Sequence, residues 1–168
     1  MNTPLTLAGA TVSVAIVIIN IRTWWKGTRE LKALVPFGGA LITGAGWTMC
    51  LGGLFGWFAS KAVEASNKVG DKGISTTTGA HGGGSLAHGS LGQLTYPGAC
   101  AVLVTAIIGG IVLKAAGKTD KKRMFGGLFA GLTLCATAGF AELMQWVPDM
   151  YNALGDAGKS VLNGDVSL

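Results

Sequence analysis

Four long apolar stretches dominate the pattern of hydrophobic and polar positions along the chain. They run roughly over residues 5–21, 36–58, 97–113 and 124–147, and a short basic segment separates the two members of each pair. A helix needs about 20 apolar residues to cross the hydrocarbon core of a bilayer. In lipid, a helix also satisfies its own backbone polar groups. The pattern therefore predicts an all-α integral membrane protein whose four transmembrane helices form two tandem helical hairpins.

A different pattern follows the last apolar stretch. Apolar residues beyond Pro148 recur at helical spacing, which predicts a C-terminal amphipathic helix. The segment between the hairpins is rich in Gly, Ser, Thr and His and is expected to be flexible. The predicted parts are a first hairpin (1–63), a flexible loop (64–96), a second hairpin (97–147) and an acidic amphipathic tail (148–168).

The two hairpins share short sequence features in the same order. A Gly-Ala pair opens the first helix of each, a Gly-Lys or Lys-Gly pair followed by Thr marks each turn, and Phe-Gly-Gly opens each second helix. Both hairpins have the same orientation, so a duplication would relate them by an axis along the membrane normal. Gly and Ala are common in this chain, so chance similarity is the alternative.

The positive charge of the chain is concentrated in the two hairpin turns. There are 13 Lys and Arg against 8 Asp and Glu, a net charge of +5. Basic residues at the ends of membrane helices set topology through the positive-inside rule. We therefore expect both turns in the cytoplasm, both termini outside a cytoplasmic (inner) membrane, and no specific nucleic-acid partner. The topology-setting residues are Arg22, Lys26, Arg29, Lys32, Lys118, Lys121, Lys122 and Arg123.

The composition argues against a soluble enzyme. Charged residues make up 12% of the chain, about half the usual fraction in soluble domains, and the common nucleophile, zinc and nucleotide motifs are missing from the sequence. Cys50, Cys100 and Cys135 fall within apolar stretches, where cysteine behaves as a small hydrophobe. His81 and His88 have no third ligand nearby in the sequence. We therefore expect no catalytic activity, no metal and no cofactor.

Two polar residues within the predicted spans are candidates for intramembrane polar sites. Glu142 is the one acidic residue in a predicted span, and such groups are functional candidates. It also lies about one turn from the outer boundary, so its carboxylate could instead reach the headgroups. Asn20, near the inner end of the first span, is expected to form an interhelical hydrogen bond.

Small residues are spaced for close helix packing in two of the predicted spans. Gly52-x-x-x-Gly56 falls in the second span and Gly127-x-x-x-Gly131 in the fourth. Glycines at this spacing let helix backbones approach each other. The sequence leaves open whether these ridges pack within one chain or between subunits.

Three functions fit these observations, and assembly is the one we favour. Paired apolar helices, tight basic turns and glycine ridges suit a non-enzymatic structural or channel-forming subunit of a membrane assembly, either a homo-oligomer or a larger complex. Residues 96–161 are similar in pattern to the small two-helix conjugative pilins of type IV secretion systems, in which two apolar helices flank a short basic loop. The high Ala, Gly and Thr content also points to a bacterial or phage genome.

The two alternatives are pore formation and transport. A holin-like pore-forming protein would suit the size and glycine content, although the outward acidic tail argues against it. A small ion or solute transporter would depend on Glu142.

Overall fold

The computed structural model describes residues 4–27, 29–50, 52–81 and 83–164, and within these ranges the chain is all-α. Helices account for 78% of the chain, and extended pairing in the described part is limited to two isolated bridges. The prediction of an all-α protein is therefore confirmed. The helices are α1 (Leu7–Lys26), the short 3-10 helix η1 (Leu31–Ala33), α2 (Val35–Thr48), α3 (Gly53–Thr78), α4 (Tyr96–Ala115), α5 (Lys118–Leu134), α6 (Ala138–Leu143) and α7 (Trp146–Asn163).

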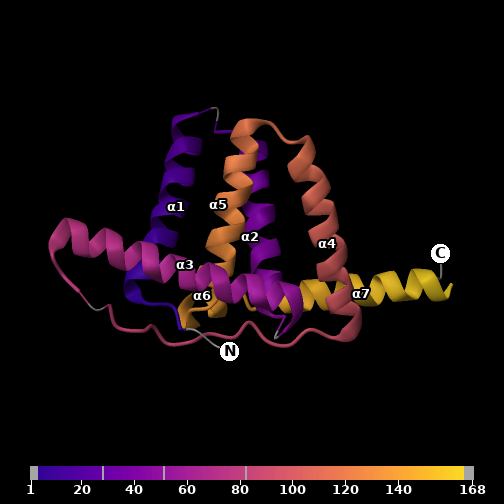
Figure 1. Cartoon of the computed structure of the whole chain (residues 1–168). Coiled ribbons are helices and arrows are strands. Elements are labelled where there is room, and N and C mark those ends of the chain that lie inside the picture. The colour runs from indigo at the N-terminus through magenta and orange to yellow at the C-terminus, as the bar shows by residue number, and fades with distance from the viewer. Residues whose placement is uncertain (1–3, 28, 51, 82, 165–168) are drawn as a thin grey trace.

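The helices α1, α2, α4 and α5 stand upright in a row, and α3 and α7 lie across one end of it (Figure 1). The order along the row is α1, α5, α2, α4, while α3 and α7 extend to opposite sides at the base. The turns that join α1 to α2 and α4 to α5 lie together at the other end. The short helix α6 also lies at the base of the row.

The prediction of four transmembrane helices is wrong. Within the described residues, two helices, α1 and α4, are long and apolar enough to cross a membrane. Each has 20 residues and so a length of about 30 Å, the thickness of the hydrocarbon core. The pair α2 and α3 would add a third span only as a bent unit, because their axes meet at 109°. With 14 and 17 residues, α2 and α5 measure only about 21 and 26 Å.

Each of the two longer apolar stretches is interrupted by a change of chain direction. In the stretch 36–58, α2 ends at Thr48 and α3 begins at Gly53, whose positive φ of 68° is a backbone conformation suited to glycine. In the stretch 124–147, α5 ends at Leu134, and the residues that follow form backbone hydrogen bonds with the segment between α3 and α4. The amide of Gly89 donates to the carbonyl of Ala136 at 2.9 Å. Hydropathy is continuous across both breaks, but the helices are not.

Half of the expected flexible loop is helical. In the segment 64–96, α3 continues to Thr78, and the described residues 79–81 and 83–95 form a non-helical linker. The buried residues of α3 are Val63, Ser66 and Gly70, and their spacing of three and four places them on one face. That face packs on α1, so tertiary contact stabilises a helix that the composition alone does not predict.

The two halves of the chain interlock. The second helices, α2 and α5, form the most extensive contact at the centre of the row, while α1 packs on α5 and α4 packs on α2. Each half also packs its first helix on its own cross-lying helix, α1 on α3 and α4 on α7. Because each first helix contacts the second helix of the other half, neither hairpin forms a separate packing unit.

Candidate functional site

The contact between α2 and α5 is a glycine seam, formed by Gly44, Gly127 and Gly131. A Cβ at Gly127 would collide with the carbonyl of Phe37, and one at Gly131 with the carbonyl of Leu41. A Cβ at Gly44 would lie 2.5 Å from the carbonyl oxygen of Leu128. The Gly127/Gly131 ridge of the sequence therefore packs backbone to backbone within the chain, which leaves these glycines unavailable for contacts between subunits.

The Gly52/Gly56 ridge lies at the start of α3 and not on α2. Gly52 caps the N-terminus of α3, and Gly56 lies in the first turn of α3, beyond the bend that ends α2. A Cβ at Gly52 would have no neighbour within 4 Å. The pair therefore does not lie on the same helix as the preceding apolar residues, because α2 ends before either glycine is reached.

Hydrogen bonds from a Thr to an Asn connect each cross-lying helix to the N-terminus of an upright helix, and we call each such contact a Thr–Asn joint. The backbone N–H and Oγ1 of Thr6 donate to Oδ1 of Asn67 at 2.9 and 3.0 Å. The corresponding groups of Thr95 donate to Oδ1 of Asn152 at 2.9 and 3.1 Å. Thr6 and Thr95 also cap α1 and α4 by accepting an N–H three residues on. The two halves of the chain thus use the same local structure.

Glycines complete both joints. Gly70, three residues after Asn67, brings α3 against the backbone of Ala8, and Gly155, three residues after Asn152, brings α7 against the backbone of Pro97. A side chain at either glycine would meet that backbone. Sequence reasoning missed these joints. Their residues nevertheless belong to two patterns that occur in both halves of the chain: Thr-x-x-Gly-Ala at 6–10 and 95–99, and Asn-x-x-Gly-Asp at 67–71 and 152–156.

A small hydroxyl cluster lies where α1, α3 and α5 meet. Ser13, Ser66 and Thr133 are each fully buried. The Oγ of Ser13 lies 2.6 Å from Oγ1 of Thr133 and 3.4 Å from Oγ of Ser66. Ser66 also donates to the carbonyl of Gly9 at 2.8 Å. These bonds satisfy the buried hydroxyls, so the cluster fixes helix positions.

The two predicted intramembrane polar residues occupy different surroundings from those expected. Glu142 lies on α6, beyond the end of α5, and its side chain is exposed. It is therefore not within a spanning helix. Asn20 is half-buried on α1, and its Nδ2 donates to the carbonyl of Ile16 at 2.9 Å. That bond lies within one helix, where an interhelical bond was expected.

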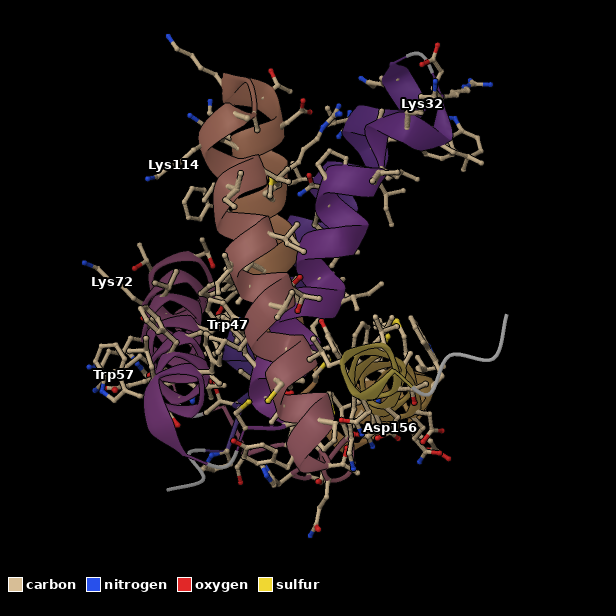
Figure 2. All side chains as sticks on the ribbon, turned by 90° about the vertical axis from the view of Figure 1, so that its right-hand side faces the viewer. Lys32, Trp47, Trp57, Lys72, Lys114 and Asp156 are labelled. Atoms are coloured by element: carbon tan, nitrogen blue, oxygen red, sulfur yellow. The ribbon has the colours of Figure 1, made fainter. Side chains whose placement is uncertain are left out.

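The predicted topology-setting residues gather at one end of the row. Lys32 and Lys114 lie at that end in Figure 2, while Lys72 and Asp156 lie on the cross-lying helices α3 and α7. Arg123 joins the two basic turns, since its Nη1 donates to the carbonyl of Ala33 at 3.0 Å. Basic residues from both halves thus share one end of the molecule.

Two clefts open between helices near that end, and their chemistry differs. The first, between α1 and α5, has a volume of about 500 Å³. We call it the basic cleft, because its polar lining consists of Asn20, Thr23, Lys118, Thr119, Lys122 and Arg123.

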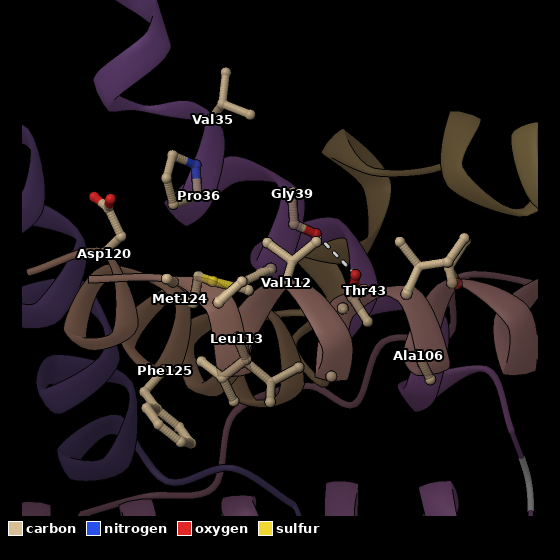
Figure 3. Close-up of a pocket in the computed structure, with 18 of the residues that line it drawn as sticks. Val35, Pro36, Gly39, Thr43, Ala106, Val112, Leu113, Asp120, Met124 and Phe125 are labelled. Atoms are coloured by element: carbon tan, nitrogen blue, oxygen red, sulfur yellow. Dashed lines mark hydrogen bonds between the residues drawn. The ribbon is translucent and has the colours of Figure 1, made fainter. Parts of the chain in front are cut away.

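The second cleft, between α4, α2 and α5, has a volume of about 650 Å³. We call it the apolar cleft. Val35, Pro36, Val112, Leu113 and Met124 surround it in Figure 3, with Asp120 at one end. Asp120 is the charged member of this lining.

No family model, characterised protein or solved structure matches the chain. Within the described residues, no group of three or more His, Cys, Asp or Glu side chains is placed to hold a metal ion. Cys50, Cys100 and Cys135 are free thiols, and Cys50 and Cys135 belong to the same hydrophobic cluster. His81 and His88 are exposed on the linker. The functional features of the described residues are therefore the helix contacts, the joints and the clefts.

Proposed function

We propose that this chain is a non-enzymatic structural subunit of a multi-subunit membrane assembly. The observation that carries the proposal is the form of α7. Its N-terminal half is buried against the bundle at Val147 and Tyr151, whereas its C-terminal half extends beyond α4 (Figure 1). Every residue from Asp156 to Gly164 is exposed, so this half of the helix has little to pack on within its own chain.

The exposed part of α7, which includes Leu154, is amphipathic. Leu154 and Val161 are 51% and 64% exposed and lie two turns apart on one face. Asp156 and Lys159 lie on the opposite face. Exposed apolar stripes rimmed by polar residues are typical of interaction surfaces. We infer that this stripe contacts a neighbouring subunit.

The upright helices supply the membrane anchor of the proposed subunit. The outer faces of α1 and α4 are exposed and apolar, with Ile18 and Ile111 as examples, which suits contact with lipid. The clustered basic residues favour the cytoplasm for the two turns. In this arrangement, α3, α7 and both termini face outward from a cytoplasmic (inner) membrane.

The mass of the purified particle in a mild detergent tests the proposal. We expect a discrete oligomer, and we expect the double substitution Leu154→Ser/Val161→Ser to lower its mass because the apolar stripe is lost. The matched control is Asp156→Ser/Lys159→Ser, which changes the same part of α7 on its polar face. The control should keep the wild-type mass.

Two results would overturn the proposal. A monomeric wild-type particle would contradict assembly itself. An oligomer whose mass is unchanged in both double variants would show that α7 is not the contact between subunits.

A further inference from the structure

We propose that the basic cleft between α1 and α5 binds the phosphate group of an anionic phospholipid. The inference rests on the membrane location given under Proposed function, but not on assembly. Lys118, Lys122 and Arg123 line the cleft from α5, and Asn20 and Thr23 line it from α1. Ammonium, guanidinium and amide groups are donors that phosphate oxygens accept from. The Thr23 hydroxyl already donates to the carbonyl of Ile19 at 2.7 Å, whereas the Asn20 amide donates to the carbonyl of Ile16 and has a second N–H.

Part of the positive charge in the cleft is not compensated by the protein. Asp120 lies 3.7 Å from Nη1 of Arg123 and so offsets that guanidinium. Among the described residues, Lys118 and Lys122 have no carboxylate within salt-bridge distance. Two lysines of like charge on one turn of α5 repel each other, and a bound phosphate would relieve that repulsion.

The walls of the cleft favour a lipid over a free anion. Ile16 and Ile19 of α1 and Gly126 of α5 line it together with the polar groups. A free phosphate needs only the polar groups, whereas the apolar walls would contact an acyl chain. Basic pockets between membrane helices on the cytoplasmic side are known to bind lipid headgroups.

The apolar cleft provides an internal comparison. The Thr–Asn joints align α1 with α4 at an offset of 89 residues, from Thr6 to Thr95. At that offset the four α1 residues of the basic cleft (16, 19, 20, 23) correspond to 105, 108, 109 and 112, all of which line the apolar cleft. Asn20 corresponds to Gly109 and Thr23 to Val112. The fold thus provides a cleft at the corresponding place in both halves, and of the two linings only the one at α1 and α5 contains Lys and Arg.

Native mass spectrometry of the detergent-purified chain tests the proposal. Phosphatidylglycerol is added in one arm, phosphatidylcholine in a second, and phosphatidylglycerol with excess inorganic phosphate in a third. We expect retention of phosphatidylglycerol but not of phosphatidylcholine, with little displacement by inorganic phosphate. Lys118→Gln/Lys122→Gln should weaken retention about tenfold or more, since it removes two charge-assisted contacts.

The control removes the same charge from the same end of the molecule. Lys26 and Lys32 line neither cleft, so Lys26→Gln/Lys32→Gln should retain phosphatidylglycerol as the wild type does. Asn20→Ala offers a second variant that leaves the charge unchanged, and it should weaken retention severalfold. Adducts are counted per chain, so the outcome is independent of oligomer mass.

Three results would overturn the inference. Equal retention of the two lipids would show that the headgroup charge is not recognised. Equal losses in the two lysine double variants would indicate general surface charge instead of the cleft. Complete displacement by inorganic phosphate would assign the site to a free anion.

Discussion

The glycine seam between α2 and α5 makes a quantitative prediction about Gly44→Ala. The new Cβ would lie 2.5 Å from the carbonyl oxygen of Leu128, where real Cβ atoms keep at least 3.0 Å from a neighbour. The two helices would have to separate by about 0.5 Å. Overpacking of this kind costs about 1–3 kcal/mol. Replacing a helical glycine by alanine returns about 1 kcal/mol through helix propensity.

Gly110→Ala measures the gain in helix propensity without the cost of overpacking. Gly110 lies on α4, which is also a long apolar helix, and its Cβ would have no neighbour within 4 Å. We therefore expect Gly110→Ala to be neutral or slightly stabilising. The difference in unfolding free energy between the two variants should equal the overpacking cost, about 1–3 kcal/mol.

The assay is denaturant unfolding of both variants in one detergent, followed by far-UV circular dichroism. Gly127→Ala repeats the test from the other helix, because its Cβ would collide with the Phe37 carbonyl. If Gly44→Ala and Gly127→Ala unfold at the same denaturant concentration as Gly110→Ala, α2 and α5 are not in backbone contact and the proposed centre of the row is wrong.

Three further predictions concern the joint, the hydroxyl cluster and the surface of α3. Asn67→Ala removes the acceptor of two hydrogen bonds from Thr6 and should lower the unfolding free energy by about 1–3 kcal/mol. Proteolysis within α3 should also accelerate. The control Asn163→Ala should leave both the unfolding free energy and the rate of proteolysis unchanged. Thr133→Val removes the buried hydroxyl 2.6 Å from Ser13 and should cost about 1–3 kcal/mol in the same unfolding assay, and an unchanged midpoint would contradict the buried contact. Hydrogen bonds from two flanking lysines lower the pKa of Glu64 from 4.5 to about 2. Because the folded pKa is the lower one, this contribution is complete above pH 4.5 and is lost as the pH falls toward 2. Glu64→Gln should therefore flatten the acid dependence of thermal unfolding over that range, and an identical dependence in the two proteins would refute the ion pairs.

The helical class and the clustering of basic residues could be predicted from the sequence, but the number of spans could not. Hydropathy does not distinguish a side chain facing lipid from one buried in protein. Phe140 and Val147 lie in the fourth apolar stretch, yet they pack at the base of the row against residues such as Tyr151. The break in the second stretch depends on the positive φ of Gly53, and a window average does not register one glycine.

The joints show a second limit of sequence reasoning. Their local patterns are visible in the sequence, but the pairing of Thr6 with Asn67 spans 61 residues and depends on how α3 turns across the base. The hypothesis of a duplication gains support from these joints, because the same atoms form the same bonds at Thr95 and Asn152. The clefts could not be predicted, since they depend on the packing of α1 on α5, a helix of the other half of the chain.

We expect both basic turns to lie on one side of the membrane and both cross-lying helices on the other. The most direct test of this arrangement is labelling of single cysteines in a cysteine-free background with a membrane-impermeant maleimide. The four positions are Lys32→Cys, Lys114→Cys, Lys72→Cys and Asp156→Cys, which mark the two ends of the molecule (Figure 2). Positions 72 and 156 should react in intact cells, and positions 32 and 114 only in inverted membrane vesicles. Reaction of positions 32 and 114 from opposite sides, or of all four from the same side, would contradict the arrangement.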